Sequence, residues 1–233
     1  MLNERFVSVI LPVYNQADHI ERALIEYLDA LRSLALPFEL IAVVNGARRD
    51  DSLDICRRVG HDHHGVRVLC IEQGGWGRSV REGMAAAKGD LICYTNAART
   101  SGKDLLLFLQ SGVAHDGSVI KANRKIRESW KRRLGSLLYN LECRWLFDLP
   151  YWDINGTPKV FPARLEELKG VREDGDLIDL EFNAICRRNN YPVIEVPVFS
   201  TSRRSGRTTT NWRSALRMYW GAWRLRKRLG VRP

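Results

Sequence analysis

The sequence predicts a single α/β domain with a Rossmann-like, mostly parallel sheet flanked by helices. Short β-branched apolar runs alternate with segments whose apolar residues recur at helical spacing, which is the pattern of repeated strand-helix-strand units. Such units are expected to have right-handed crossovers. The chain has 233 residues, 45% of them hydrophobic, which suits one large domain better than two small ones.

The first half of the chain contains the clearest alternation. Strands are expected at residues 7–13, 38–44, 66–71 and 91–95. Between them, helices are expected from about residue 20, from about residue 52 and over residues 79–88. Apolar residues at helical spacing identify the first helix: Ile20, Leu24, Tyr27, Leu28 and Leu31.

The stretch from residue 89 to residue 104 is expected to hold the functional site. It contains the fourth strand and the polar loop Asn96-Ala97-Ala98-Arg99-Thr100, which leaves the end of that strand. In open α/β sheets, ligands bind at this edge. A glycine-rich turn, Gly74-Gly75-Trp76-Gly77-Arg78, opens the preceding helix and is expected to reach the same crevice.

Beyond residue 104 the pattern is less regular. Helices are expected at residues 105–109, 124–145 and 179–188, and strands at residues 118–122, 159–161 and 191–199. The turn Asp153-Ile154-Asn155-Gly156 precedes the second of these strands. Pro192 and Pro197 favour an edge position for the last strand, because proline cannot donate a ladder hydrogen bond.

Charge is distributed unevenly along the chain. Residues 1–120 carry 13 basic and 15 acidic side chains, whereas residues 121–233 carry 24 and 12. The basic half predicts an anionic partner, and nucleic acid, phospholipid or a phosphorylated substrate would each satisfy it. Nucleic acid is not expected, because the basic run at 124–133 shows no aromatic stacking platform with interleaved basic residues.

Five widely spaced cysteines without a Cys-X-X-Cys motif predict reduced core thiols, with neither a zinc nor a redox site. The sequence shows neither an apolar run long enough for a membrane span nor a signal-peptide pattern, so a cytosolic protein is expected.

Several short motifs follow one another along the chain: Val9 to Asn15, Asn45 to Ser52, Gly75-Trp76-Gly77-Arg78, Asn123-Arg124, Asp153 to Lys159, Asp179 and Glu181, Glu195-Val196-Pro197-Val198, and Arg204 to Thr208. Together they resemble the family 2 glycosyltransferases, in particular the branch with dolichyl-phosphate mannose synthase and bacterial polyprenyl-phosphate sugar transferases. The order and spacing of these motifs cover nearly the whole chain.

The resemblance implies a nucleotide-sugar-binding GT-A fold and inverting transfer of a sugar from a nucleotide diphosphate to a polyprenyl phosphate or related acceptor. The residues implied for nucleotide-sugar binding are Pro12, Tyr14, Asn15, Asn45, Gly75, Gly77 and Arg78. Those implied for the acceptor phosphate are Arg124, Arg132 and Ser136, and those implied for catalysis are Asn96, Arg99, Asp153 and Arg204.

One motif departs from the family pattern. The Asp-X-Asp that holds a divalent metal in the family falls on Asn96-Ala97-Ala98, so both carboxylates are missing. No metal site is therefore predicted, with Asn96 left as a weak candidate for a loosely bound Mg²⁺ or Mn²⁺. The expected substitutes for the charge of the metal are Arg99 and Lys103 in the same loop, with Arg78 and Arg204 able to approach. A non-catalytic relative that binds a nucleotide sugar is the alternative, and a nucleic-acid-binding protein ranks third.

The C-terminal segment is expected to be a basic amphipathic helix at residues 211–233, following a glycosyltransferase domain at 1–210. That domain would divide into a nucleotide-sugar half at about 1–110 and an acceptor half at about 111–210. Trp212, Leu216, Tyr219 and Trp223 form one stripe of the helix beside a row of arginines. The helix could lie on the anionic inner face of the cytoplasmic membrane, or it could pack its aromatic stripe on the domain.

Overall fold

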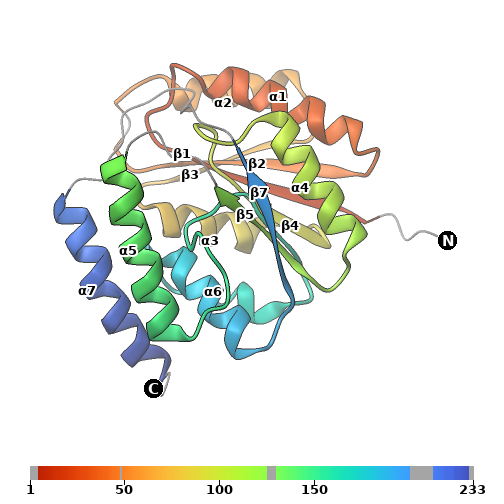
Figure 1. Ribbon diagram of the computed structural model, residues 1–233. Coiled ribbons are helices and arrows are strands. Elements are labelled where there is room, and N and C mark those ends of the chain that lie inside the picture. The colour runs from red at the N-terminus through yellow and green to blue at the C-terminus, as the bar shows by residue number, and fades with distance from the viewer. Residues whose placement is uncertain (1–4, 48, 125–129, 200–211, 231–233) are drawn as a thin grey trace.

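A computed structural model describes residues 5–47, 49–124, 130–199 and 212–230, with the backbone alone at 130–134 and 212–216. The strands form one seven-stranded sheet in the order β3-β2-β1-β4-β6-β5-β7 (Figure 1). They span β1 (Val7–Val13), β2 (Phe38–Asn45), β3 (Val66–Ile71), β4 (Leu91–Tyr94), β5 (Val119–Arg124), β6 (Lys159–Pro162) and β7 (Val193–Val198).

The helices connect these strands and cover both faces of the sheet. They are α1 (Ile20–Ser33), α2 (Ser52–Asp62), α3 (Trp76–Ala86), α4 (Gly102–Ala114), α5 (Trp130–Phe147), α6 (Ile178–Arg188) and α7 (Trp212–Leu229), with a short 3₁₀ helix at Glu166–Leu168. Figure 1 shows α1, α2 and α4 on one side of the sheet and α3 and α6 on the other. The predicted α/β architecture is confirmed.

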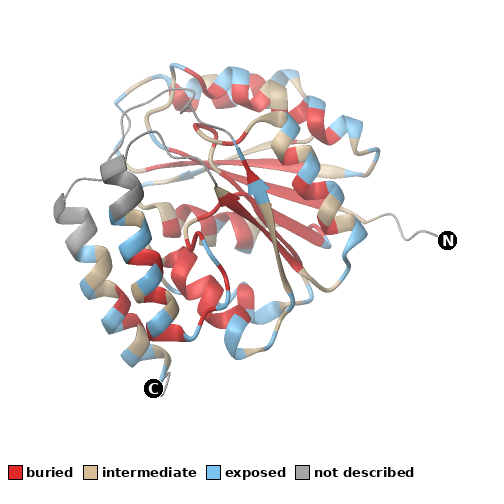
Figure 2. Cartoon of the chain, in the orientation of Figure 1, coloured by how far each residue is buried: buried red, intermediate tan, exposed pale blue. Residues whose placement is uncertain are grey.

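Alternation along the buried strands fills two cores. Val9 and Leu11 of β1 belong to the cluster under α1, α2 and α4, whereas Ile10 belongs to the cluster under α3, α5 and α6. Successive side chains of a strand point to opposite faces, so a strand covered on both faces is apolar throughout. Figure 2 accordingly shows the central strands buried along their length.

The second half of the sheet differs from the simple alternation. β6 runs antiparallel to both β4 and β5, while β5 and β7 are parallel. β7 forms the edge, as its prolines predicted. Arg124, where the sequence predicted a helix to begin, continues the β5 ladder with β7, and α5 spans Trp130–Phe147 among the described residues.

The last helix packs on the domain beside α5. Tyr219 of α7 meets Tyr139 of α5 edge to face at 5.7 Å between ring centroids, and its hydroxyl donates to the Gly135 carbonyl at 3.1 Å. Ala222 and Leu225 are buried in the same interface. Tyr219 of the predicted stripe thus serves packing, while Trp223 is 47% exposed; the side chains of Trp212 and Leu216 lie outside the described residues.

Candidate functional site

The candidate site lies where the strand order reverses. The chain runs from β1 outward through β2 to β3 and then returns to β4 on the other side of β1. The carboxyl ends of these parallel strands meet at one edge of the sheet, and the connections from β1 and β4 leave in opposite directions there. This topology produces a crevice for a ligand.

Asn45 joins three of the segments at this edge. Its side-chain amide donates to the Val13 carbonyl at 2.9 Å, and its oxygen accepts from the Gly75 N–H at 3.3 Å. The residue is only 6% exposed, so these bonds replace its hydration. Asn45 therefore holds the end of β1 against the glycine turn.

The ends of β1 and β2 are also in direct contact. A Cβ at Gly46, where φ is +72°, would lie 3.0 Å from the Tyr14 ring and 3.1 Å from the Gly74 Cα. Pro12 is buried within β1, Asn15 has a left-handed φ of 46°, and the Asn15 side chain accepts from the Arg49 N–H at 3.0 Å. Tyr14 is 41% exposed at this edge of the sheet.

The glycine turn packs tightly against the loop before α6. A Cβ at Gly75 would lie 2.5 Å from the Asp174 carbonyl oxygen, and one at Gly77 would lie 2.3 Å from the Glu173 carbonyl oxygen. Both glycines therefore permit close backbone approach. The carboxylate of Asp174 forms ion pairs with both Arg78 and Arg81, so the arginine predicted to bind nucleotide phosphate is held by an acid.

The loop after β4 has a fixed local structure. The Asn96 side-chain oxygen accepts from the Ala98 N–H at 3.0 Å, and the Asn96 carbonyl accepts from the Arg99 and Thr100 N–H groups. Ala97 and Ala98 are buried. Thr100 accepts a hydrogen bond from the Thr95 hydroxyl at 2.8 Å, which closes the loop back onto the strand end.

This loop does not fit a divalent metal. At the three positions of the Asp-X-Asp motif the one side-chain oxygen is that of Asn96, which is bonded within its own turn, and the methyl groups of Ala97 and Ala98 follow it. Mg²⁺ is usually held by carboxylates together with substrate phosphate oxygens. Among the described residues, no three His, Cys, Asp or Glu side chains cluster as metal ligands. Arg99 and the exposed Lys103 provide positive charge in or next to this loop, whereas Arg204 lies outside the described residues.

Asp153 and Arg124 form a buried bidentate pair. One Asp153 carboxylate oxygen accepts from the Arg124 N–H at 2.9 Å and its Nε at 2.7 Å, and the other accepts from Nη2 at 2.7 Å. Asp153 is 4% exposed. Burial opposes the charge of Arg124, but the Asp153 carboxylate outweighs it and the pKa of the guanidinium is raised.

A second buried pair lies beneath the end of β4. Lys159 Nζ contacts the Asp179 carboxylate, which also accepts from the Tyr94 hydroxyl at 2.9 Å. Lys159 is fully buried, with the rings of Tyr94 and Phe182 within 6 Å of its ammonium. Burial lowers the pKa of Lys159, although Asp179 opposes that shift.

Two acidic residues in the first turn of α6, Asp179 and Glu181, were part of the family resemblance. Both are buried: Asp179 pairs with Lys159, and Glu181 accepts from the N–H groups of Arg172 and Glu173 at 2.8 and 2.7 Å. Desolvation and the charge of Asp179 raise the pKa of Asp176, which is nevertheless exposed at the same loop.

The other two residues predicted to bind the acceptor phosphate, Arg132 and Ser136, lie in α5. The side chain of Arg132 is outside the described residues. Ser136, one turn further along, accepts from the Asn140 side chain at 3.3 Å. Asn140 in turn accepts from the Ile154 N–H at 2.9 Å, which connects this helix to the turn that carries Asp153.

Sequence reasoning missed Lys121, Tyr94 and Asp174. Lys121 carries a usable signal, because it stands alone among the apolar residues of a predicted strand, and a lysine there requires buried partners. Asp174 carries none, since its contacts with Arg78 and Arg81 join segments more than 90 residues apart.

Comparison with known proteins identifies the family of this chain. The family model described as "Glycosyl transferase family 2" matches residues 8–137. An undecaprenyl-phosphate 4-deoxy-4-formamido-L-arabinose transferase of Edwardsiella ictaluri is 25% identical over 87% of this chain and 62% of its own. The protein of that name from Pseudomonas syringae pv. syringae is 29% identical over 82% of this chain and 58% of its own. The chain thus spans about 60% of the length of these two relatives.

Solved structures share the fold. Glucosyl-3-phosphoglycerate synthase from Mycobacterium tuberculosis, in complex with Mn²⁺, uridine diphosphate and phosphoglyceric acid, has a TM-score of 0.71 with this chain. Sequence identity is 16%, and the match covers 98% of this chain and 80% of the synthase. A second complex of that enzyme holds Mg²⁺ and uridine diphosphate.

Proposed function

Because the chain belongs to glycosyltransferase family 2, we propose that it transfers a sugar, with inversion, from a nucleotide diphosphate to a polyprenyl phosphate or a related lipid-linked acceptor. The polyprenyl acceptor is motivated by the names of the curated relatives, and the nucleotide donor by the uridine diphosphate in structures of the same fold. The single observation within this chain that carries the proposal is the convergence of Tyr14, Asn45 and the glycine turn at the strand-order reversal.

The donor would bind along this edge. The Tyr14 ring offers a stacking surface for the base, and the polar loop residues Asn15 and Asn45 lie beside it. Arg78 would meet the diphosphate after exchanging its Asp174 partner for phosphate oxygens, because guanidinium groups bind both kinds of anion bidentately.

The acceptor would bind on the β5 side, near Arg124. A phosphate acceptor is already ionised near neutral pH, so it needs no general base. Catalysis then requires alignment of the two substrates and stabilisation of the departing diphosphate. We assign this stabilisation to arginines, with Arg99 first, because Asn96-Ala97-Ala98 does not supply metal ligands. The competing proposal is that a weakly bound Mg²⁺ or Mn²⁺ at Asn96 stabilises the diphosphate. A chelator would abolish transfer in that case but not if arginines provide the charge.

We further propose that the protein acts at the inner face of the cytoplasmic membrane, on a surface formed by α5 and α7, the α5–α7 face. Figure 1 shows these helices side by side at the edge of the molecule. Six large apolar side chains are exposed there: Leu137, Leu138, Leu141, Trp145, Trp220 and Trp223. Tryptophan suits the membrane interface, and basic residues in the last turn of α7 suit anionic lipid. Among the described residues, no helix is long and apolar enough to cross a bilayer.

Vesicle sedimentation tests the α5–α7 face. Trp145→Ser/Trp220→Ser removes two side chains that are 70% and 69% exposed. The double variant should lose binding to vesicles that contain phosphatidylglycerol. The control is Leu107→Ser on α4, which removes an apolar side chain 47% exposed outside this face. Equal binding by all three proteins would contradict this location.

A transfer assay tests the activity. Nucleoside diphosphate sugars are first ranked by the thermal shift that they produce, since a ligand that binds only the native state raises the unfolding temperature. The selected donor is then incubated with a polyprenyl phosphate, and the lipid-linked sugar is measured by mass spectrometry. Donor binding without transfer to any acceptor would favour the second candidate, a non-catalytic nucleotide-sugar-binding protein, for which the missing carboxylates are the supporting observation.

A further inference from the structure

We infer that Lys121 and Glu195 are positioning residues that fix the turn carrying Asp153 and, through it, the guanidinium of Arg124. Arg124 is the acceptor-phosphate residue of the proposed function, on which this part of the inference rests. The positioning itself depends only on the contacts described below.

Lys121 is buried in β5, next to the edge strand β7, and all three of its donors have partners. Its ammonium donates to the Trp152 carbonyl at 2.6 Å, to the Asp153 carbonyl at 3.1 Å and to Glu195 Oε1 at 2.8 Å. The side chain is 0% exposed. Two of the three partners are backbone oxygens of the turn, so the lysine binds the turn itself as well as its counterion.

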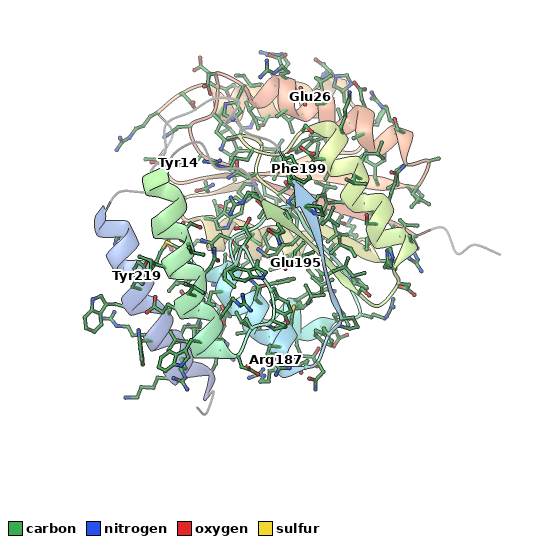
Figure 3. All side chains as sticks on the ribbon, viewed as in Figure 1. Tyr14, Glu26, Arg187, Glu195, Phe199 and Tyr219 are labelled. Carbon is green, nitrogen blue, oxygen red and sulfur yellow. The ribbon has the colours of Figure 1, made fainter. Side chains whose placement is uncertain are left out.

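Glu195 binds the same turn with its other oxygen. Oε2 accepts from the Trp152 N–H at 3.0 Å, while Oε1 holds Lys121. Its side chain is 19% exposed and comes from the edge strand β7, where Figure 3 labels it. β7 runs parallel to β5, and Lys121 lies opposite Glu195 in their register. The pairing of the two strands therefore brings these side chains together.

The turn needs such support because its backbone is unusual. Asp153 adopts a left-handed φ of 47°, which side chains rarely occupy. Gly156 lies so close to β5 that a Cβ there would be 1.9 Å from the Ala122 carbonyl oxygen. The turn is therefore pressed against β5 at one end and bound by the Lys121–Glu195 pair at the other.

The Asp153 carboxylate transmits this position to Arg124. It binds the backbone N–H, Nε and Nη2 of Arg124 together, and Nη2 also donates to the Asn155 carbonyl at 2.9 Å. A guanidinium held on two sides by one turn has its orientation fixed before a phosphate arrives. Pre-oriented binding groups lose less conformational freedom on binding.

A buried ion pair can stabilise the fold without positioning the turn. The bonds from Lys121 to the Trp152 and Asp153 carbonyls allow these two roles to be tested separately. Lys121→Met removes both carbonyl contacts and leaves Glu195 without its cation. Lys121→Met/Glu195→Leu removes both charges, so stability should recover while the turn stays unsupported. Leu28→Ala, in the core beneath α1, is the control for destabilisation without a change at the turn.

Two measurements follow on each variant of the full chain. The first is the amide hydrogen exchange of Arg124, whose N–H is bonded to Asp153. Exchange should become about tenfold faster in both Lys121 variants, as expected for loss of one well-ordered hydrogen bond. The Thr95 N–H, bonded to the Ile10 carbonyl, should be unchanged. The second is the affinity for farnesyl phosphate, a soluble polyprenyl phosphate, which should fall about tenfold while uridine diphosphate affinity stays constant.

The outcomes separate the inference from the proposed function. Unchanged exchange at Arg124 in both Lys121 variants, or equal acceleration in Leu28→Ala, would overturn the positioning role whatever the ligands do. Faster exchange with unchanged farnesyl phosphate affinity would establish the positioning and overturn the acceptor role of Arg124. Wild-type protein that binds no farnesyl phosphate would refute the acceptor class, and the exchange result would still decide the inference.

Discussion

Replacing Lys159 by methionine tests the electrostatic core beneath the candidate site. The substitution preserves much of the side-chain volume but removes the ammonium that faces Asp179. Asp179 is 4% exposed, so its charge would remain in the interior with the Tyr94 hydroxyl as a donor. Breaking a buried pair on one side costs roughly 3–5 kcal/mol.

The position of Asp179 in the first turn of α6 reduces this cost. A helix N-terminus stabilises a nearby anion by up to about 1 kcal/mol in ordinary cases, so the expected loss of unfolding free energy is about 2–4 kcal/mol. A domain of this size loses roughly 2–4 °C in melting temperature per kcal/mol, which gives a decrease of about 4–16 °C.

Urea and thermal unfolding would measure the effect. Lys159→Met/Asp179→Leu should recover at least half of the loss, because the uncompensated charge is gone. Tyr94→Phe, which removes only one hydrogen bond to Asp179, should cost about 1 kcal/mol. A Lys159→Met protein as stable as wild type, or a double variant less stable than either single one, would refute the buried-pair reasoning.

Three further predictions concern the donor site and the sheet. Transfer should be largely insensitive to EDTA, and Arg99→Ala should reduce it more than Asn96→Ala; activity that chelator abolishes and excess metal restores would favour a metal at Asn96 instead. Arg78→Ala should weaken nucleoside diphosphate binding in calorimetry by about tenfold, the usual scale of one charge-assisted contact, and unchanged affinity would remove Arg78 from the site. Burial alone would raise the pKa of Glu39, but hydrogen bonds from Ser8 and the Lys88 N–H together with the Arg67 guanidinium lower it below 4.5. The free energy of unfolding that this carboxylate contributes is present above pH 4.5 and is lost as the pH falls through the lowered pKa of the folded state. Glu39→Gln should therefore make the free energy of unfolding less dependent on pH in the acid range. An unchanged pH dependence would contradict this assignment.

The parallel half of the fold could be read from the sequence because each strand there is a continuous apolar run. Val7–Val13 and Phe38–Asn45 are buried on both faces, and each is followed by a helix with one apolar side. The expected convergence at the strand ends depends only on this alternation and on the shared direction of the strands. These features are local in sequence, and local patterns determine them.

The second half of the sheet could not be read in the same way. β6 has four residues, Lys159–Pro162, and so short a run does not show its direction or its neighbours. The position of Lys159 under Tyr94 follows from the antiparallel register of β4 and β6. Asp174 reaches the glycine turn only through the packing of α3 against α6. Tertiary packing therefore decides which charges meet at the site.

The buried charges bear on whether the protein is a catalyst or only a binder. Asn96-Ala97-Ala98 has lost the family's acidic pair, yet three ion pairs that include Lys121, Arg124 and Lys159 remain largely buried within or next to β5 and β6. Well-packed apolar residues are often as stable as a buried ion pair, so stability alone does not account for three of them. Two of these pairs, Lys121–Glu195 and Arg124–Asp153, hold the turn at Asp153 and the guanidinium of Arg124 together. Under the proposed function, the orientation of that guanidinium serves transfer to a second, anionic substrate, which a protein that binds only a nucleotide sugar does not need.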